Sequence, residues 1–304
     1  MSEAGMRYLL EALNAGSMRS ASDRLNIAAS SISRQISQLE QQLGLALIEK
    51  GRRGVKLTHA GEIVIEHYRN QLADREALNA KLGELRSVKV GQATIAVGEG
   101  FLGRSFNGLI SQFARDNPQI NLEILTGSSQ EIVRMIVEDA AHVGLVFQTP
   151  HDLKLHVRST AAQPLMAIVP PGHALAERPS VGIAELAEYP LCLPPVQFRI
   201  RQILAAAELR TGCHLEPVVT TNSIHVMQEM VRSGVALTVL PQVAVWSELD
   251  DGVVIGVPFD SDAVEETTVS LILRSGRQLE GAPIRILKMI EAQVRKWDRA
   301  AKAP

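Results

Sequence analysis

The spacing of apolar residues changes near residue 90, and this change constrains the fold more than any other feature of the sequence. Before it, apolar residues recur every three to four positions, as in amphipathic helices; after it, short apolar runs alternate with helical stretches. We therefore expect a helical domain over 1–58, a long helix over 59–88 and an α/β region over 91–304. A length of 304 residues fits two or three such units.

The first domain contains three short helical patterns, over 6–15, 19–25 and 30–43. In the third pattern one apolar stripe is formed by Ile32, Ile36, Leu39 and Leu43, and polar residues cover the rest of its surface. Such a face can enter the major groove of double-stranded DNA, where small hydroxyls permit close approach and Arg and Gln reach phosphates or base edges. The candidate contacts are Ser30, Ser31, Ser33, Arg34, Gln35 and Gln38. A merely solvated face is the alternative.

The segment from Gly51 to Thr58 combines glycines, basic residues and alternating apolar positions, which indicates a basic hairpin, or wing. Arg52 and Arg53 are its candidate DNA contacts. Thr58 is a suitable N-cap for a helix from His59 to about Ser87, far longer than the average of about 11–12 residues.

This long helix carries a broken heptad-like stripe that one small domain could not bury alone. Its members are Val64, Tyr68, Leu72, Leu78, Leu82 and Leu85. We expect the helix to link the two domains and to pair with a second copy, so that the protein self-associates as a dimer or tetramer.

The order and spacing of several motifs in residues 5–69 resemble the N-terminal signature of LysR-type transcriptional regulators. They are Ala21-Ser-Asp-Arg-Leu25, Ser33-Arg-Gln-Ile36, Leu39-Glu40, Leu43-Gly44 and Leu57-Thr-x-Ala-Gly61. The resemblance implies a winged helix-turn-helix, with Arg34 contacting phosphate or base and the wing arginines holding the DNA backbone. Where many members have Ser-Gln-Pro, this chain has Ala28-Ala29-Ser30, so a glutamine that commonly reads bases is missing. A sensor that has lost DNA binding stays open as an alternative.

From Gly91 onward, strands alternate with helices, which indicates an α/β fold with a parallel sheet. The expected strands cover 93–97, 120–125, 143–147, 164–170, 191–193, 217–219, 236–240 and 267–273, and a final helix covers 283–297. The LysR resemblance implies a two-lobed, periplasmic-binding-protein-like effector domain, with lobe I formed by 91–161 and 266–304 and lobe II by 162–265. A cleft between such lobes would bind a small-molecule effector.

Residues at strand-to-helix turns are the candidate effector contacts, because free N–H groups at helix starts suit an anion. They are Glu99, Gly100, Phe101, Ser128, Ser129, Gln148, Gln197, Phe198, Arg199, Asn222 and Ser223. Arg199 or Arg201 could pair with a carboxylate. Glu99 would repel an anion, so it would face solvent, pair with an arginine, or indicate a cationic or hydroxyl-bearing ligand. The family resemblance makes an organic acid or an aromatic metabolite plausible.

The main alternative function is dinucleotide binding, because Gly98-Glu-Gly-Phe-Leu-Gly103 matches G-x-G-x-x-G and Glu123 follows at the spacing of a ribose-binding acid. Bulky Phe101 argues against it, because it follows the glycine that should let pyrophosphate approach. Catalytic and metal-binding motifs are otherwise absent from the sequence, so we expect no enzyme, no cofactor and no metal.

The formal net charge is only −2, but basic residues outnumber acidic ones in the first sixty positions, which suits a local phosphate footprint. Cys192 and Cys213 are isolated and are expected to be reduced thiols, and His142 is expected to be a surface or hydrogen-bonded histidine. Neither a secretory segment nor a membrane span is recognisable, so we expect a cytoplasmic protein without a membrane partner.

Overall fold

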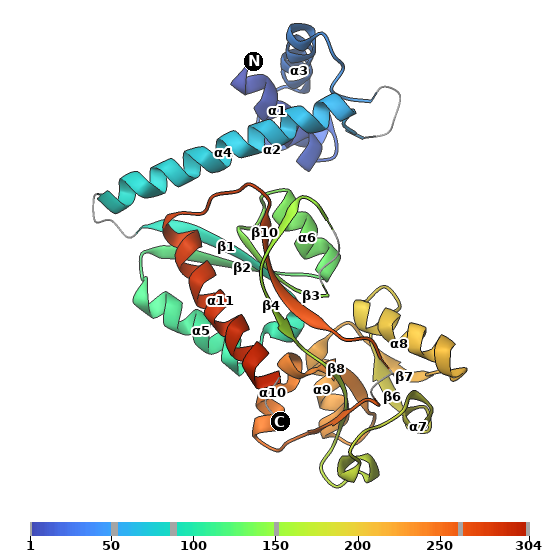
Figure 1. Cartoon of the computed structure of the whole chain (residues 1–304). Helices are drawn as coiled ribbons and strands as arrows, with labels where there is room; N and C mark the ends of the chain where they lie inside the picture. Colours follow the sequence, from blue (N-terminus) through green and yellow to red (C-terminus); the bar gives the residue numbers. More distant parts are fainter. Residues whose placement is uncertain (1, 50–53, 86–89, 149–151, 261–263, 302–304) are drawn as a thin grey trace. The chain divides into compact units, whose positions relative to one another are not determined.

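The computed structural model describes residues 2–49, 54–85, 90–148, 152–260 and 264–301. The chain divides into two compact units, residues 1–79 and 80–304. The first unit is helical and the second is α/β, so the change of periodicity near residue 90 marks a real change of architecture (Figure 1).

Three short helices pack around one apolar core in the first unit. They are α1 (Glu3–Asn14), α2 (Met18–Leu25) and α3 (Ala29–Leu43). Ser2 and Ser17 cap the first two by accepting hydrogen bonds from backbone amides of the first turn. In α3, Ile32, Ile36 and Leu39 are at most 2% exposed, which confirms the predicted stripe.

The described part of the wing is a short antiparallel pairing between Ile48 and Leu57. The amide of Glu49 donates to the carbonyl of Lys56 at 2.9 Å, so the two arms run side by side. Arg52 and Arg53 lie outside the described residues.

The long helix α4 (His59–Leu85) begins where the sequence predicts, because the Thr58 hydroxyl accepts the amide of Gly61 at 3.1 Å. Gly61 itself is required by packing: a Cβ there would lie 2.2 Å from the carbonyl oxygen of Leu47.

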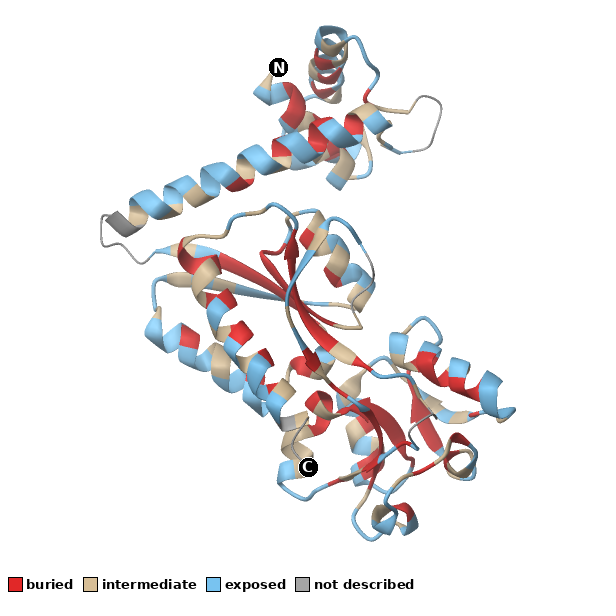
Figure 2. Cartoon of the chain, in the orientation of Figure 1, coloured by how far each residue is buried: buried red, intermediate tan, exposed pale blue. Residues whose placement is uncertain are grey.

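Only the later part of the predicted stripe on α4 is exposed. Val64 and Tyr68 are buried in the core of the first unit and Leu72 packs against that core, so they do not form a seam for a second chain. Leu78 and Leu82 remain 56% and 46% exposed. Figure 2 shows the same change along the helix, and the side chain of Leu85 is not described.

Lobe I of the second unit is built on a five-stranded sheet in the order β2-β1-β3-β10-β4. Its strands are β1 (Gly91–Val97), β2 (Ile120–Thr126), β3 (Val143–Phe147), β4 (Leu155–Ala162) and β10 (Thr268–Arg274). Helices α5 (Arg104–Asp116) and α11 (Gly281–Ala301) share one core with the sheet, and α6 (Ser129–Val137) packs in a second core. A 3₁₀ turn, η1 (Glu99–Phe101), follows β1.

Lobe II contains a three-stranded sheet, β8-β5-β9, and a two-stranded sheet, β6-β7. The strands are β5 (Leu165–Val169), β6 (Leu191–Leu193), β7 (Pro217–Thr220), β8 (Thr238–Pro241) and β9 (Ile255–Pro258). The helices are α7 (Ile183–Leu186), α8 (Arg199–Thr211), α9 (Ile224–Arg232) and α10 (Gln242–Asp250), with the 3₁₀ turn η2 (Ala174–Glu177).

The predicted parallel pairing holds for part of each lobe, because β1 pairs parallel with β2 and β3, and β6 pairs parallel with β7. Strand β10, by which the chain returns to lobe I after lobe II, pairs antiparallel with both β3 and β4. In lobe II, β5 pairs antiparallel with both β8 and β9. Strands β4 and β9 were also not predicted from the sequence.

Two chain segments and one helix hold the lobes together. Where the two segments cross between the lobes, the amide of Gln163 donates to the carbonyl of Thr267, and the Gln163 side chain accepts the amide of Val243 at 2.8 Å. In α10, Val243 and Trp246 pack in the core of lobe I, whereas Ala244 packs in that of lobe II. The lobes therefore share buried side chains as well as backbone connections.

Candidate functional site

The exposed face of α3 is formed by polar side chains that pair with nothing in the described structure. Ser30, Ser31, Ser33, Arg34 and Gln38 are exposed, and Gln35 is half-buried at the border with the core. Their side chains make no hydrogen bond or ion pair with any described residue. Donors and acceptors left to water in this way can be given to a ligand at little cost.

Glu40 is the first acidic residue after this polar face, and its carboxylate is bound to the backbone. Its carboxylate accepts the amides of Leu47 and Ile48, at 2.7 and 3.3 Å, and so fixes the loop between α3 and the wing. In the sequence analysis Glu40 was part of the Leu39-Glu40 motif and was given no role of its own.

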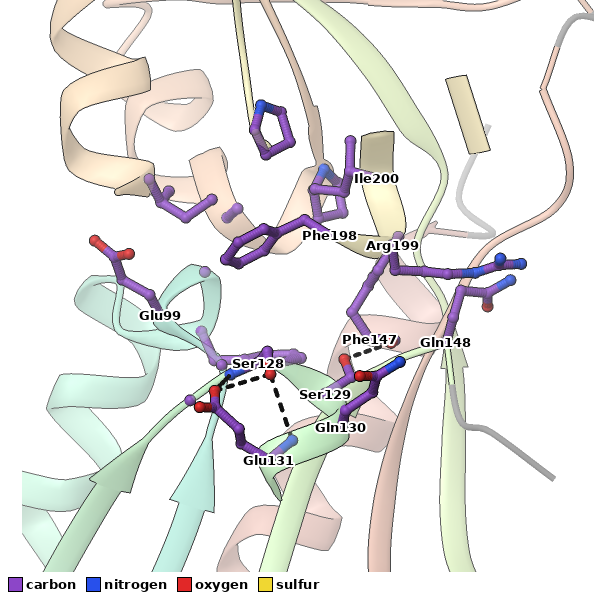
Figure 3. A pocket seen from close by; sticks show the side chains of 18 of the residues that line it. Glu99, Ser128, Ser129, Gln130, Glu131, Phe147, Gln148, Phe198, Arg199 and Ile200 are labelled. Carbon is purple, nitrogen blue, oxygen red and sulfur yellow. Dashed lines mark hydrogen bonds between the residues drawn. The ribbon is translucent and has the colours of Figure 1, made fainter. Parts of the chain in front are cut away.

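A cavity of about 1020 Å³ lies between the two lobes (Figure 3). This is just above the range of about 300–1,000 Å³ for small-molecule sites. The predicted candidates that line it are Glu99, Gly100, Phe101, Ser128, Ser129, Gln148, Gln197, Phe198, Arg199 and Asn222. Ser223 does not line it, but its hydroxyl donates to the carboxylate of Glu99 at 2.9 Å and so joins lobe II to lobe I.

The N-terminus of α6 faces the cavity, but the helix caps itself. Ser128 and Glu131 form a capping box, in which Glu131 accepts both the amide and the hydroxyl of Ser128 at 2.8 Å. These two hydrogen bonds hold the pKa of Glu131 below its ordinary value. The Ser129 hydroxyl donates to the carbonyl of Phe147 at 2.9 Å.

Arg199 and Arg201 lie two positions apart in α8 and have different surroundings. Arg199 lines the cavity and forms an ion pair with Glu265, to which the amide group of Gln148 also donates at 3.3 Å. Arg201 is buried inside lobe II, where it pairs with Glu208 at 2.5 Å. The suggestion that Arg201 could serve a ligand carboxylate is therefore wrong, because its charge is already bound inside the lobe.

Apolar side chains that the sequence did not single out form much of the cavity wall. They include Val157, Ile200, Ile224, Met227 and Val243. Polar additions come from β4 and β10, namely Thr160, Thr268 and Ser270. The sequence did not single out Thr160 because β4 was not recognised as a strand.

The geometry around η1 differs from that of a dinucleotide site. The ring of Phe101 is buried, with its centroid 5.9 Å from that of Trp297, and a Cβ on Gly100 would lie 3.3 Å from Ala244. Glu123 lies in the middle of β2 and accepts the hydroxyl of Thr94 at 3.0 Å, rather than standing at the end of the strand beside the cavity. Gly98–Gly103 thus forms a packed turn.

The other singled-out side chains are structural. The ring of His142 is buried and accepts the amide of Thr94 at 2.9 Å, as expected for a hydrogen-bonded histidine. Cys192 and Cys213 are unpaired thiols, and burial raises the pKa of Cys192. Within the described residues, no cluster of His, Cys, Asp and Glu could hold a metal ion, and no helix is long and apolar enough to cross a membrane.

Two family models match the chain. The one described as LysR substrate binding domain matches residues 86–293, and the one described as bacterial regulatory helix-turn-helix protein, lysR family, matches residues 4–62. The two matches correspond to the α/β and helical units of the structure.

Curated relatives carry the names of regulators. The HTH-type transcriptional regulator YnfL of Escherichia coli, described as uncharacterized, is 29% identical over 242 residues, covering 78% of this chain and 80% of the relative. The HTH-type transcriptional regulator SsuR of Burkholderia cenocepacia is 25% identical over 291 residues, covering 93% and 92%. These names point to a non-enzymatic regulator.

Solved structures share the fold along the whole chain. A full-length OxyR variant from Pseudomonas aeruginosa aligns with a TM-score of 0.67 at 19% identity, covering 97% of this chain and 95% of that one. CbnR complexed with its target DNA aligns with a TM-score of 0.54 at 20% identity, covering 98% and 100%. The chain therefore belongs to the LysR family of transcriptional regulators, which bind DNA through a helix-turn-helix and carry a substrate-binding effector domain.

Proposed function

We propose that this regulator binds promoter DNA with the exposed face of α3 and the wing, and that a small molecule in the interlobe cavity controls the bound state. The proposal of DNA binding rests on one observation, the unpaired face of α3, which has Arg34 at its centre and no acid exposed on it. An arginine in this position can bind guanine in the major groove or a phosphate. A protein that binds promoters works where the chromosome lies, so we place it in the cytoplasm.

Pairing of two chains would present two α3 helices to half-sites about one DNA turn apart. Leu78 and Leu82 support this proposal, because they lie four residues apart on α4 and stay exposed in the single chain. We expect Leu82→Asp to shift the sedimentation coefficient toward a smaller species. The matched control is Leu209→Asp on α8, where the leucine is 86% exposed. If Leu82→Asp left the oligomer intact, α4 would not be the pairing surface.

The effector half rests on the cavity and on α10. Phe147 and Phe198 line the cavity, which supports the aromatic metabolite named among the expected effectors. A ligand changes the protein's state only if it binds one arrangement of the lobes more tightly than the other. Helix α10 packs in the cores of both lobes. A change in the arrangement of the lobes must therefore move buried side chains as well as the two chain segments that connect the lobes.

Fluorescence anisotropy with DNA from upstream of the protein's own coding sequence tests the DNA half. We expect tight, salt-dependent binding that unrelated DNA does not share, and a loss of about 1–3 kcal/mol of binding free energy in Arg34→Ala. Arg115→Ala is the matched control, because Arg115 is exposed on α5 and makes no ion pair with any described residue. Equal binding by Arg34→Ala and the native protein would disprove the placement of the recognition helix.

A further inference from the structure

The charges around the interlobe cavity are unevenly distributed. Of the described residues that line it, three are acidic, Glu99, Glu131 and Asp152, and one is basic, Arg199. Arg199 is already neutralised by Glu265, which is not itself part of the lining. A ligand in this cavity therefore meets an excess of negative charge.

The place where a carboxylate ligand would bind is filled by the protein itself. A helix N-terminus attracts anions, and in α6 that position is taken by the carboxylate of Glu131, which holds the amide and hydroxyl of Ser128. The carboxylate of a ligand would be repelled by that of Glu131 and would have to displace it from the helix N-terminus. The arrangement disfavours an organic acid at this end of the cavity.

Glu99 lines the cavity with a solvent-exposed carboxylate that is accessible to a cation. Its recorded partner is the neutral hydroxyl of Ser223, and no described cation of the protein lies within hydrogen-bonding distance of it. In Figure 3 the ring of Phe198 and the side chain of Arg199 leave the backbone in opposite directions, and Glu99 lies away from Arg199. The Glu99 end of the cavity thus combines a carboxylate, an aromatic ring and the apolar side chain of Ile224, which would lie 3.9 Å from a Cβ on the neighbouring Gly100.

We propose that the effector of this cavity is an organic cation, an amine whose ammonium group pairs with Glu99 while its carbon skeleton packs against Phe198 and Ile224. Carboxylate and aromatic ring are the two groups that bind ammonium ions most favourably in proteins. The inference rests on the proposed function, in which this cavity is the effector site. It replaces the organic acid of the sequence analysis with a ligand of opposite charge.

The test is a thermal-shift and calorimetric comparison on the full chain with matched compounds that differ in charge. The pairs are phenethylamine with 3-phenylpropanoate, tyramine with 3-(4-hydroxyphenyl)propanoate, and 1,5-diaminopentane with pimelate. We expect at least one amine to raise the melting temperature, its carboxylate counterpart to have no effect, and the amine's affinity to fall about ten- to a hundredfold in Glu99→Gln. Glu216→Gln, an exposed acid outside the cavity, should bind the amine like the native protein.

DNA binding by the same preparations separates the two proposals. Native protein that binds DNA but responds only to carboxylates, or to neither member of any pair, overturns the organic-cation effector. So does an amine whose affinity is unchanged in Glu99→Gln. Native protein that binds no DNA contradicts the proposed function, whatever the amines do.

Discussion

The exposed face of α3 and the wall of the interlobe cavity are both rich in hydroxyl, amide and charged side chains, but they use them differently. On α3 these groups pair with no described residue, whereas in the cavity Ser128, Ser129 and Arg199 are already bonded to other parts of the chain. DNA can therefore replace water on α3 without breaking any contact of the fold. A ligand in the cavity must compete with existing contacts, which is how its binding can change the protein's state.

The largest effect on stability is expected where pairing is complete and buried. Glu208 accepts hydrogen bonds from Arg201 at 2.5 Å and from the amide of Leu215 at 2.6 Å, and both charged residues are under 10% exposed. Burial raises the pKa of Glu208, but these hydrogen bonds outweigh burial and leave the pKa lowered. Glu208→Ala should lower the free energy of unfolding by about 3–5 kcal/mol, because it leaves Arg201 buried without its partner.

Chemical denaturation followed by circular dichroism measures this loss, with Glu216→Ala as an exposed control. A loss under about 1 kcal/mol would mean that Arg201 reaches solvent when Glu208 is removed. In that case Arg201, like Arg199, would be an arginine that can exchange its partner for water.

Most elements could be predicted from the sequence because their apolar spacing is set by local packing. Val143–Phe147 and Leu191–Leu193 agree to the residue, since each is a short run buried on both faces. Strand β4 was missed because it lies at the edge of its sheet, with exposed positions that blur the alternation. Strand β9 was missed because two of its four residues are Gly256 and Pro258, and glycine and proline are rare in strands.

The sequence could predict where the candidate site lies, but not which of its side chains form ion pairs with other parts of the chain. Turns after strands placed Ser128 and Phe198 at the cavity, because the ends of strands and the starts of helices meet there. The ion pair of Arg199 with Glu265 joins residues far apart in sequence, and local spacing carries no information about such contacts. For the same reason the sequence could not distinguish Arg199 from Arg201.

A smaller effect is expected at the capping box of α6. Ser128→Ala removes the hydroxyl that bonds Glu131, so it should cost about 1 kcal/mol of stability at neutral pH. Because the pKa of Glu131 is lowered in the folded state, its contribution is present above the ordinary glutamate pKa of about 4.3 and is lost as the pH falls through the lowered value.

The difference in unfolding free energy between Ser128→Ala and the native protein should therefore shrink below about pH 4. Ser111→Ala, in the middle of α5, is the control without a capping role. A difference that stayed constant down to the lowest pH at which the protein folds would show that Glu131 does not stabilise this end of the helix.

A still smaller effect is expected for the cavity arginine. Arg199 and Glu265 have side chains 41% and 43% exposed, and exposed ion pairs contribute about 0–1 kcal/mol. Arg199→Ala should change the unfolding free energy by less than Ser128→Ala does, and added salt should reduce the difference further. A loss of more than about 2 kcal/mol of unfolding free energy would show that Arg199, like Arg201, has a structural role and is not available to bind a ligand.

The smallest effect on stability is expected on the exposed face of α3. Arg34→Ala removes a side chain that contacts no described partner, and Ala is at least as favourable as Arg within a helix, so the unfolding free energy should change by no more than about 0.5 kcal/mol. Thermal melting of the free protein measures this change, and the anisotropy assay measures the loss of DNA binding in the same preparation. A variant that melts several degrees lower would reveal a structural role for Arg34, and its loss of DNA binding could then reflect damage to the helix instead of a missing contact. If Arg34 serves only to contact DNA, the variant should melt at the same temperature as the native protein and yet lose DNA binding.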